Sequence, residues 1–99
     1  MKLSRRSVEP TSAQREIRIV NELGLHARPA AEFVRKAHGF RSEIWLIKEG
    51  QRFSATSLIE VMRANLERGA AVTLEAHGVD AEVAVDALEE LVRNLRDVD

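Results

Sequence analysis

The sequence predicts one α/β (α+β) domain of two layers, an open-faced sandwich in which three helices cover one face of a four-stranded antiparallel sheet. Three observations support this prediction. The length of 99 residues suits a single domain. Its segments have the periods of strands and helices in the order βαββαβα. The four strand-like segments are short and alternate apolar with polar residues, which indicates a sheet with one buried face.

Residues 1–15, MKLSRRSVEPTSAQR, show no hydrophobic period and mix Ser, Thr and Pro with scattered charges. This composition favours a segment that does not pack. We therefore expect a flexible N-terminal extension over residues 1–15 and a folded domain over residues 16–99. The extension is interpreted as an unstructured leader, with a partner-binding arm as the alternative.

The first strand and the first helix come next. A strand is predicted to begin at Glu16, because apolar and polar residues alternate from there to Val20. Apolar residues then recur with the spacing i, i+3, i+4 and i+7, which indicates a helix that Gly39 ends. This apolar stripe consists of Ala30, Phe33, Val34 and Ala37.

A hairpin and a short helix occupy the middle of the chain. Residues 42–47 (SEIWLI) are rich in branched and aromatic residues, and a tight turn leads from them into a strand at residues 52–55. Ser57 with Glu60 three residues later matches a capping box. A helix is therefore predicted to start there and to run to about Leu66.

The last strand and the last helix complete the order. Residues 71–76 (AVTLEA) alternate as a fourth strand, and Asp80 is placed to cap the final helix with its carboxylate. The apolar face of this helix consists of Ala81, Ala84, Val85, Leu88, Leu91, Val92 and Leu95.

The stretch GLHARPA, residues 24–30, lies where the first strand ends and the first helix begins. Pro29 suits a first helical turn, because the amide hydrogen that it lacks would have no acceptor there, and this places His26 at or near the N-cap. The backbone amides of Ala27 and Arg28 and the positive end of the helix dipole then form an anion site. The guanidinium of Arg28 adds a fork that suits phosphate oxygens.

The same positive field disfavours a protonated imidazole, so we expect His26 to stay neutral near pH 7 with one ring nitrogen free to attack. A neutral nucleophile beside an anion site is what phosphoryl transfer to histidine requires. The alternative for a lone histidine here is a capping residue beside a solvated arginine.

Composition excludes several classes of function. With 15 basic and 16 acidic residues the net charge is -1, so no global charge attracts nucleic acid or an anionic membrane. The lack of cysteine excludes a disulfide framework and a cysteine nucleophile. No apolar run reaches the ~18 residues of a membrane span, and no signal peptide is evident. We expect a cytoplasmic protein without direct membrane insertion.

The chain has two further histidines, and a zinc site would require all three to lie close together. His38 and His77 each precede a glycine at the end of a predicted element and are interpreted as surface residues. Together with His26 they match no zinc-binding spacing. We expect neither a metal nor a cofactor.

The stretch GLHARPA resembles the HPr family, the histidine-containing phosphocarrier proteins of the bacterial sugar phosphotransferase system, and its nitrogen-related paralogues. The segments FVRKAHGFRSEI, ATSLIEVM, RGAAVTLEAHG and AVDALEELV occur at matching spacing, so the resemblance runs from about Glu16 to Leu95. It implies the same open-faced sandwich, and a stoichiometric phosphoryl carrier rather than an independent enzyme.

The resemblance also implies roles for single residues. His26 would accept on Nδ1 a phosphoryl group that enzyme I derives from phosphoenolpyruvate, and would pass it to an enzyme IIA domain. Arg28 would help to hold the phosphate. Leu58 and Ile59 would form an apolar patch that docks partners, the alternative being that one of them is a core residue. We expect the chain to be a monomer.

Ser57 matches a serine that a regulatory serine kinase/phosphorylase modifies in some bacteria. The residues alone explain it as an N-cap, worth roughly 1 kcal/mol. Glu60 stands in the same turn, where many relatives carry a small residue, and would repel a phosphate. Asn65 likewise stands where many relatives have glycine close to the histidine, so the loop packing there is expected to differ.

Two other functions remain as alternatives. A regulatory interaction module, as a nitrogen-type paralogue or a serine-kinase-controlled co-regulator, would act by binding partner proteins. A ligand-binding domain would sense a small anion at the helix start without covalent modification. The presence of both His26 and Arg28 favours the carrier.

Overall fold

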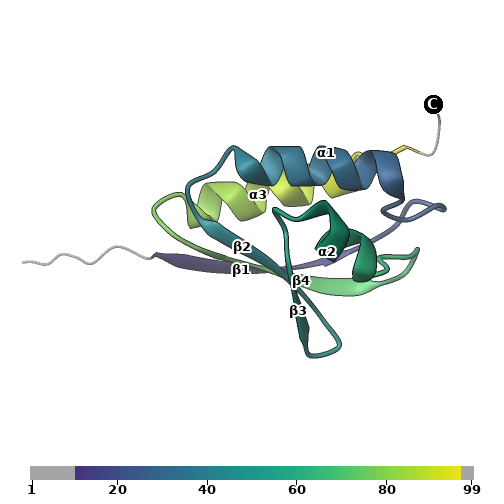
Figure 1. The fold of residues 1–99 in the computed structure, drawn as a ribbon, viewed down its shortest axis with the longest axis horizontal. Helices are drawn as coiled ribbons and strands as arrows, with labels where there is room; N and C mark the ends of the chain where they lie inside the picture. The colour runs from purple at the N-terminus through teal and green to yellow at the C-terminus, as the bar shows by residue number, and fades with distance from the viewer. Residues whose placement is uncertain (1–10, 97–99) are drawn as a thin grey trace, which may run out of the picture.

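The computed structural model describes residues 11–96, and in these the predicted order of strands and helices is confirmed. Residues 1–10 of the expected extension lie outside the described residues, as do residues 97–99. The elements are β1 (Ser12–Arg18), α1 (Ala27–His38), β2 (Glu43–Lys48), β3 (Gln51–Ser54), α2 (Leu58–Arg63), β4 (Ala71–His77) and α3 (Ala81–Arg93). The three helices lie on one face of the sheet (Figure 1), so the two-layer open-faced sandwich is confirmed.

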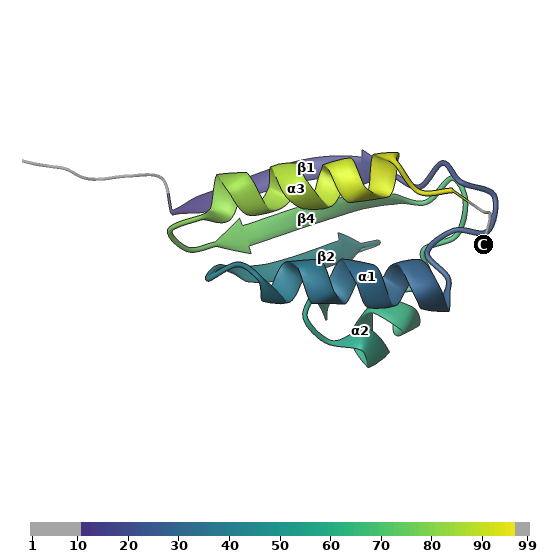
Figure 2. The same cartoon turned by 90° about the horizontal axis from the view of Figure 1, so that it is seen from above.

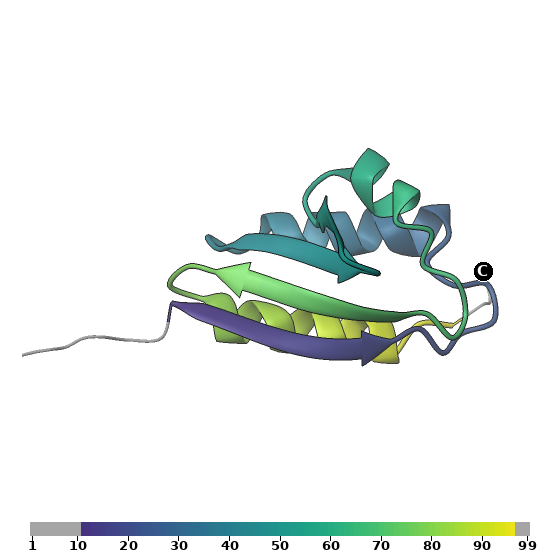
Figure 3. The ribbon, with the colours of Figure 1, turned by 90° about the horizontal axis from the view of Figure 1, so that it is seen from below.

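The four strands form one sheet in the order β1-β4-β2-β3, with every neighbouring pair antiparallel. β1 and β3 are therefore the edges of the sheet. Figure 3 shows β1, β4 and β2 side by side on the face that carries no helix. Lys48 pairs with Gln51, which leaves Glu49 and Gly50 as the turn of the β2–β3 hairpin, as predicted.

The core lies between the sheet and the helices. Val72, Leu74 and Ala76 alternate along β4 and are buried on the helix side. Phe33 of α1 and Leu88 of α3 are fully buried against this layer. Each large apolar side chain buried in this way stabilises the fold by about 1.5–3 kcal/mol, which fixes both helices on the sheet. Figure 2 shows α1 and α3 running along the sheet, with α2 beside α1.

The predicted start of the first strand is wrong by four residues. β1 begins at Ser12 instead of Glu16, so part of the expected extension belongs to the sheet. The reason is a tertiary contact of Arg15, whose guanidinium reaches the carboxylates of Glu82, Asp86 and Glu89 on α3 at 3.1, 2.8 and 2.6 Å. These ion pairs satisfy a charged side chain that points to the helix layer, and local periodicity does not reveal them.

Two predicted details of the helices are also wrong. α2 ends at Arg63 rather than near Leu66, because Asn65 turns the chain with a left-handed φ of 55°. Asp80 occupies the N-cap position of α3, but its side chain makes no capping hydrogen bond. Its carboxylate instead accepts hydrogen bonds from Arg41 and Ser42 in the loop before β2.

Candidate functional site

His26 occupies the N-cap of α1, as predicted from Pro29. Its backbone is extended, with φ −76° and ψ −171°, and its carbonyl accepts the first helical hydrogen bond from the amide of Ala30 at 2.9 Å. The side chain is exposed and makes no capping hydrogen bond. The backbone of His26 therefore begins the helix while its side chain stays exposed.

The first turn of α1 is an unneutralised positive helix end. The amides of Ala27 and Arg28 have no acceptor inside the helix, and Pro29 contributes no amide hydrogen. All residues of this turn are described, and none is acidic. Two main-chain donors and the uncompensated helix dipole consequently lie next to the imidazole of His26.

Arg28 is two residues along the same turn and is exposed. Within residues 11–96, its guanidinium takes part in neither a hydrogen bond nor an ion pair. An arginine held in no internal pair keeps all its donors available for an external anion. The structure thus brings His26, Ala27 and Arg28 together at one helix terminus.

The chain before His26 is fixed by the loop that follows α2. The amide of Leu25 donates to the carbonyl of Leu66 at 2.8 Å, and the Leu25 side chain is buried. Gly24 has a φ of +65°, and a Cβ placed there would lie 2.5 Å from the same carbonyl oxygen. Glycine is required at this position both for its backbone conformation and for this close approach.

Lys48 supports the same loop, and sequence reasoning missed this role. Its ammonium donates to the carbonyl oxygens of Ala64 at 3.0 Å and Asn65 at 2.7 Å. A cation at the C-terminus of a helix interacts favourably with the carbonyls there, and the Asn65 carbonyl also accepts from the amide of Glu67 at 3.0 Å. Asn65 takes the left-handed conformation there, which asparagine tolerates better than most residues. No sequence signal connects Lys48, on β2, with the end of α2.

Exposed apolar side chains lie beside the site, which we call the apolar patch: Leu23, Leu58, Ile59 and Met62, which are 59%, 43%, 73% and 43% exposed. Leu58 and Ile59 are therefore surface residues, and the alternative that one of them is a core residue is wrong. A hollow of about 190 Å³ lies between His26 and Met62, with Leu23 on its rim. Leu23 and Met62 were not expected from the sequence as members of this patch.

Ser57 forms half of the predicted capping box. Its hydroxyl accepts a hydrogen bond from the amide of Glu60 at 3.2 Å. The carboxylate of Glu60 does not return to the N-cap amide and instead accepts from the amide of Ser54 at 3.3 Å. The carboxylate therefore lies at the same helix start as the hydroxyl, where it opposes a second negative group on Ser57.

The other histidines lie away from this site. His38 is at the opposite end of the 12-residue helix α1, which separates it from His26 by about 18 Å. His77, at the end of β4, has its Nε2 atom 3.4 Å from the Glu75 carboxylate. His26 and His38 cannot share one metal ion at that separation. In the part of the chain that the structure describes, no helix is long and apolar enough to cross a membrane.

Comparison with known proteins shows which family this chain resembles in sequence. The sequence model described as "PTS HPr component phosphorylation site" matches residues 13–94. A phosphocarrier protein HPr of Buchnera aphidicola subsp. Baizongia pistaciae is 40% identical over 83 residues, which are 84% of this chain and 98% of that protein. The residues matched by the family model include the start of α1, the β2–β3 hairpin and α3.

Solved structures agree with the sequence matches. A phosphocarrier protein HPr from Bacillus anthracis superposes with a TM-score of 0.79 at 33% identity, covering 83% of this chain and 98% of that one. The Bacillus subtilis catabolite repression protein Crh, solved as a dimer with a swapping domain, gives a TM-score of 0.67 at 32% identity over 94% of each chain.

Proposed function

The chain belongs to the HPr family of phosphocarrier proteins, and we propose that it carries its phosphoryl group on His26, received from enzyme I and passed to enzyme IIA domains. The observation that carries this proposal is an exposed imidazole without a capping bond at the N-terminus of α1, beside the exposed side chain of Arg28. A protein of this kind is a stoichiometric intermediate and turns over no substrate of its own.

The geometry supports a direct transfer. A ring nitrogen of His26, in the family Nδ1, attacks phosphorus while the bond between phosphorus and the donor atom of enzyme I breaks. The negative oxygens of the moving group are met by the amides of Ala27 and Arg28 and by the Arg28 guanidinium. Because these groups are in place before the reaction, the carrier contributes positioning and charge stabilisation and needs no acid or base of its own.

The apolar patch is the surface that we assign to the docking of both partners. Leu58, Ile59 and Met62 lie along one side of α2, and the hollow beside Met62 leads to His26. An apolar area next to a charged centre is typical of a transient interface, because it adds burial while the reactive group stays reachable. A single surface would then serve enzyme I and the IIA domain in turn.

The decisive experiment is a phosphorylation assay on the full chain with enzyme I and phosphoenolpyruvate, read by intact-mass spectrometry. We expect the mass of one acid-labile phosphate, which a IIA domain then removes. His26→Ala should gain none, and His38→Ala, which changes an exposed histidine on the same helix, should behave as the parent. An unmodified parent, or a modified His26→Ala chain with native circular dichroism, contradicts the proposal.

A regulatory module is the second candidate, and the half-exposed Ser57 hydroxyl at the start of α2 is the observation in its favour. Glu60 opposes it, since its carboxylate lies in the same turn. If a serine kinase/phosphorylase acts here, Glu60→Gly should speed modification of Ser57 several-fold, because the repulsion is removed. Binding of either form to a partner in the absence of transfer from His26 would favour this candidate over the carrier.

A further inference from the structure

Among the described residues, no strand pairs with the main-chain groups on the outer edge of β1. In residues 11–96, β1 pairs with β4 alone, and Figure 3 shows it at the margin of the sheet. Thr11 and Ile19, at either end of an unbroken register, direct their main-chain bonds to the β4 side. In an antiparallel strand the residues between them alternate, so the outward amides and carbonyls belong to Ser12, Gln14, Glu16 and Arg18.

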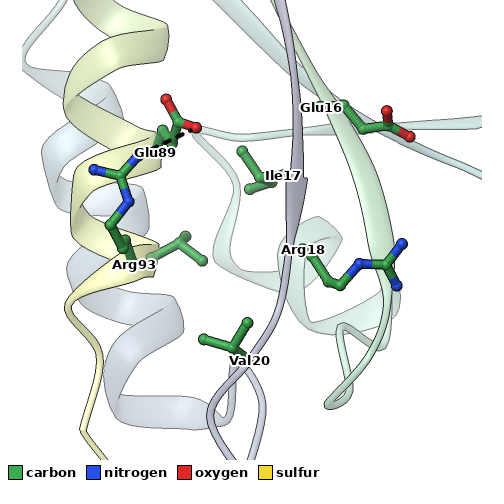
Figure 4. A pocket seen from close by; sticks show the side chains of 7 residues that line it. Glu16, Ile17, Arg18, Val20, Glu89 and Arg93 are labelled. Carbon is green, nitrogen blue, oxygen red and sulfur yellow. Dashed lines mark ion pairs between the residues drawn. The ribbon is translucent and has the colours of Figure 1, made fainter.

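The charges along this edge are ordered. Glu16 and Arg18 project to the same side of β1, whereas Ile17 lies between them toward α3 (Figure 4). A hollow of about 200 Å³ between β1 and α3 is lined by the apolar side chains of Ile17, Val20 and Val92. Val20 is 60% exposed at its end. Acid, apolar residue and base thus follow one another along an edge with open hydrogen-bonding groups.

We propose that this edge pairs with the same edge of a second copy of the chain, antiparallel and about a twofold axis at Ile17. In that register Glu16 of each copy lies opposite Arg18 of the other, which makes two cross-strand ion pairs on the open face. The outward-bonding residues then oppose one another, as an antiparallel ladder requires. The strand is self-complementary in charge only in this direction and register.

Neighbouring registers are disfavoured by the same charges. An axis at Glu16 would place two carboxylates opposite each other, and an axis at Arg18 would place two guanidinium groups opposite each other. Glu16 has no side-chain partner within residues 11–96, and Arg18 donates through one nitrogen to the Gly69 carbonyl, which leaves the other free. Charged edge residues therefore select one pairing while they discourage indiscriminate association.

Helix α3, which packs beside β1, also carries an acidic residue followed by a basic one. Glu89 and Arg93 of α3, paired with each other at 3.4 Å, line the same hollow and present an acid before a base. α2 packs against α1 and β3, at the other edge of the sheet. Leu58, Ile59 and Met62, the patch residues on α2, therefore stay accessible in the pair. The dimer differs from the monomer expected from the sequence.

The test is sedimentation equilibrium of the full chain from micromolar to millimolar concentration. We expect reversible dimers in the parent, and a dissociation constant raised about tenfold or more in Glu16→Arg and in Arg18→Glu, since each change makes both cross-strand pairs repulsive. The double exchange Glu16→Arg/Arg18→Glu should restore the parent value. Glu32→Arg, on the exposed side of α1, is the matched control and should change nothing.

Three results would overturn the proposal. The first is a parent chain that stays monomeric at millimolar concentration. The second is a dimer whose dissociation constant ignores the single charge reversals while circular dichroism shows native folds. The third is a dimer that survives dilution for hours, because exchange of whole strands between copies dissociates slowly whereas edge pairing relaxes rapidly.

Discussion

The starts of α1 and α3 are built alike and are used differently. In each, a glycine lies two residues before a polar N-cap: Gly24 before His26, and Gly78 before Asp80. Both glycines have positive φ and are pressed against neighbouring backbone. A Cβ on Gly24 would meet the Leu66 carbonyl oxygen at 2.5 Å, and one on Gly78 would meet the Ser42 Cα at 2.7 Å.

The difference lies in what the N-cap side chain binds. The Asp80 carboxylate accepts from the amides of Arg41 and Ser42 at 2.9 and 3.0 Å and from the Ser42 hydroxyl at 2.6 Å. These bonds, the Ser42 hydroxyl foremost, lower the pKa of Asp80 and tie α3 to β2. The His26 ring forms no capping bond. The Asp80 side chain is thus engaged by the loop before β2, whereas the exposed His26 side chain stays available for chemistry.

The largest change in phosphorylation rate is expected for a substitution of Arg28. If the α1 start is a phosphate site, Arg28→Ala should slow phosphorylation of His26 about 100-fold, because one charge-assisted donor to the moving group is lost. The unfolding free energy should not change, since Arg28 is exposed. Rapid-quench kinetics measures the rate, with Arg35→Ala on the same helix as the control. Equal rates in the two variants would remove Arg28 from the site.

Substitution of the two glycines tests whether the two helix starts contribute equally to stability. Gly24→Ala and Gly78→Ala should each lower the free energy of unfolding by about 2–3 kcal/mol, from backbone strain and overpacking. Urea unfolding measures both values. Only Gly24→Ala should also slow phosphorylation, because it alone displaces the chain that holds His26. Similar slowing in both variants would mean that general destabilisation is the cause.

Asp80→Asn should lower the stability of the fold without changing the phosphorylation of His26. The amide retains one acceptor oxygen but loses the negative charge that three donors favour, so the thermal midpoint should fall by several degrees. Scanning calorimetry measures the midpoint, and the phosphorylation rate serves as the internal control. An unchanged midpoint would show that the bonds from Arg41 and Ser42 are not net stabilising.

The smallest expected effect is on how the stability of the fold depends on pH in the acid range. Because the pKa of Asp80 in the folded chain lies below its ordinary value of 3.8, its contribution is complete above that value and is lost as the pH falls through the folded value. Glu75, whose pKa is lowered by Gln14 first and then by His77, adds to this loss. Urea midpoints between neutral and strongly acidic pH should therefore decline less in Asp80→Asn. Parallel profiles for both chains would contradict this.

The sequence was informative where a residue's role depends on its near neighbours. Pro29 was enough to place His26 at the N-cap, and the apolar periods located each layer of the fold. The sequence did not reveal contacts between residues that are far apart along the chain. Arg15 was assigned to an extension because its carboxylates lie on α3, and Asp80 was assigned a capping bond because its donors lie before β2. The contacts of Lys48 were missed for the same reason.

The ion pairs between Arg15 and α3 couple the local unfolding of β1 to that of α3. Glu82, Asp86 and Glu89 share one side of α3 and repel one another once their common guanidinium is withdrawn. Separation of β1 from the sheet therefore weakens α3 at the same time, so β1 and α3 behave as one cooperative unit. Amide protons in β1 and α3 should exchange with solvent in step, and added salt should accelerate both together.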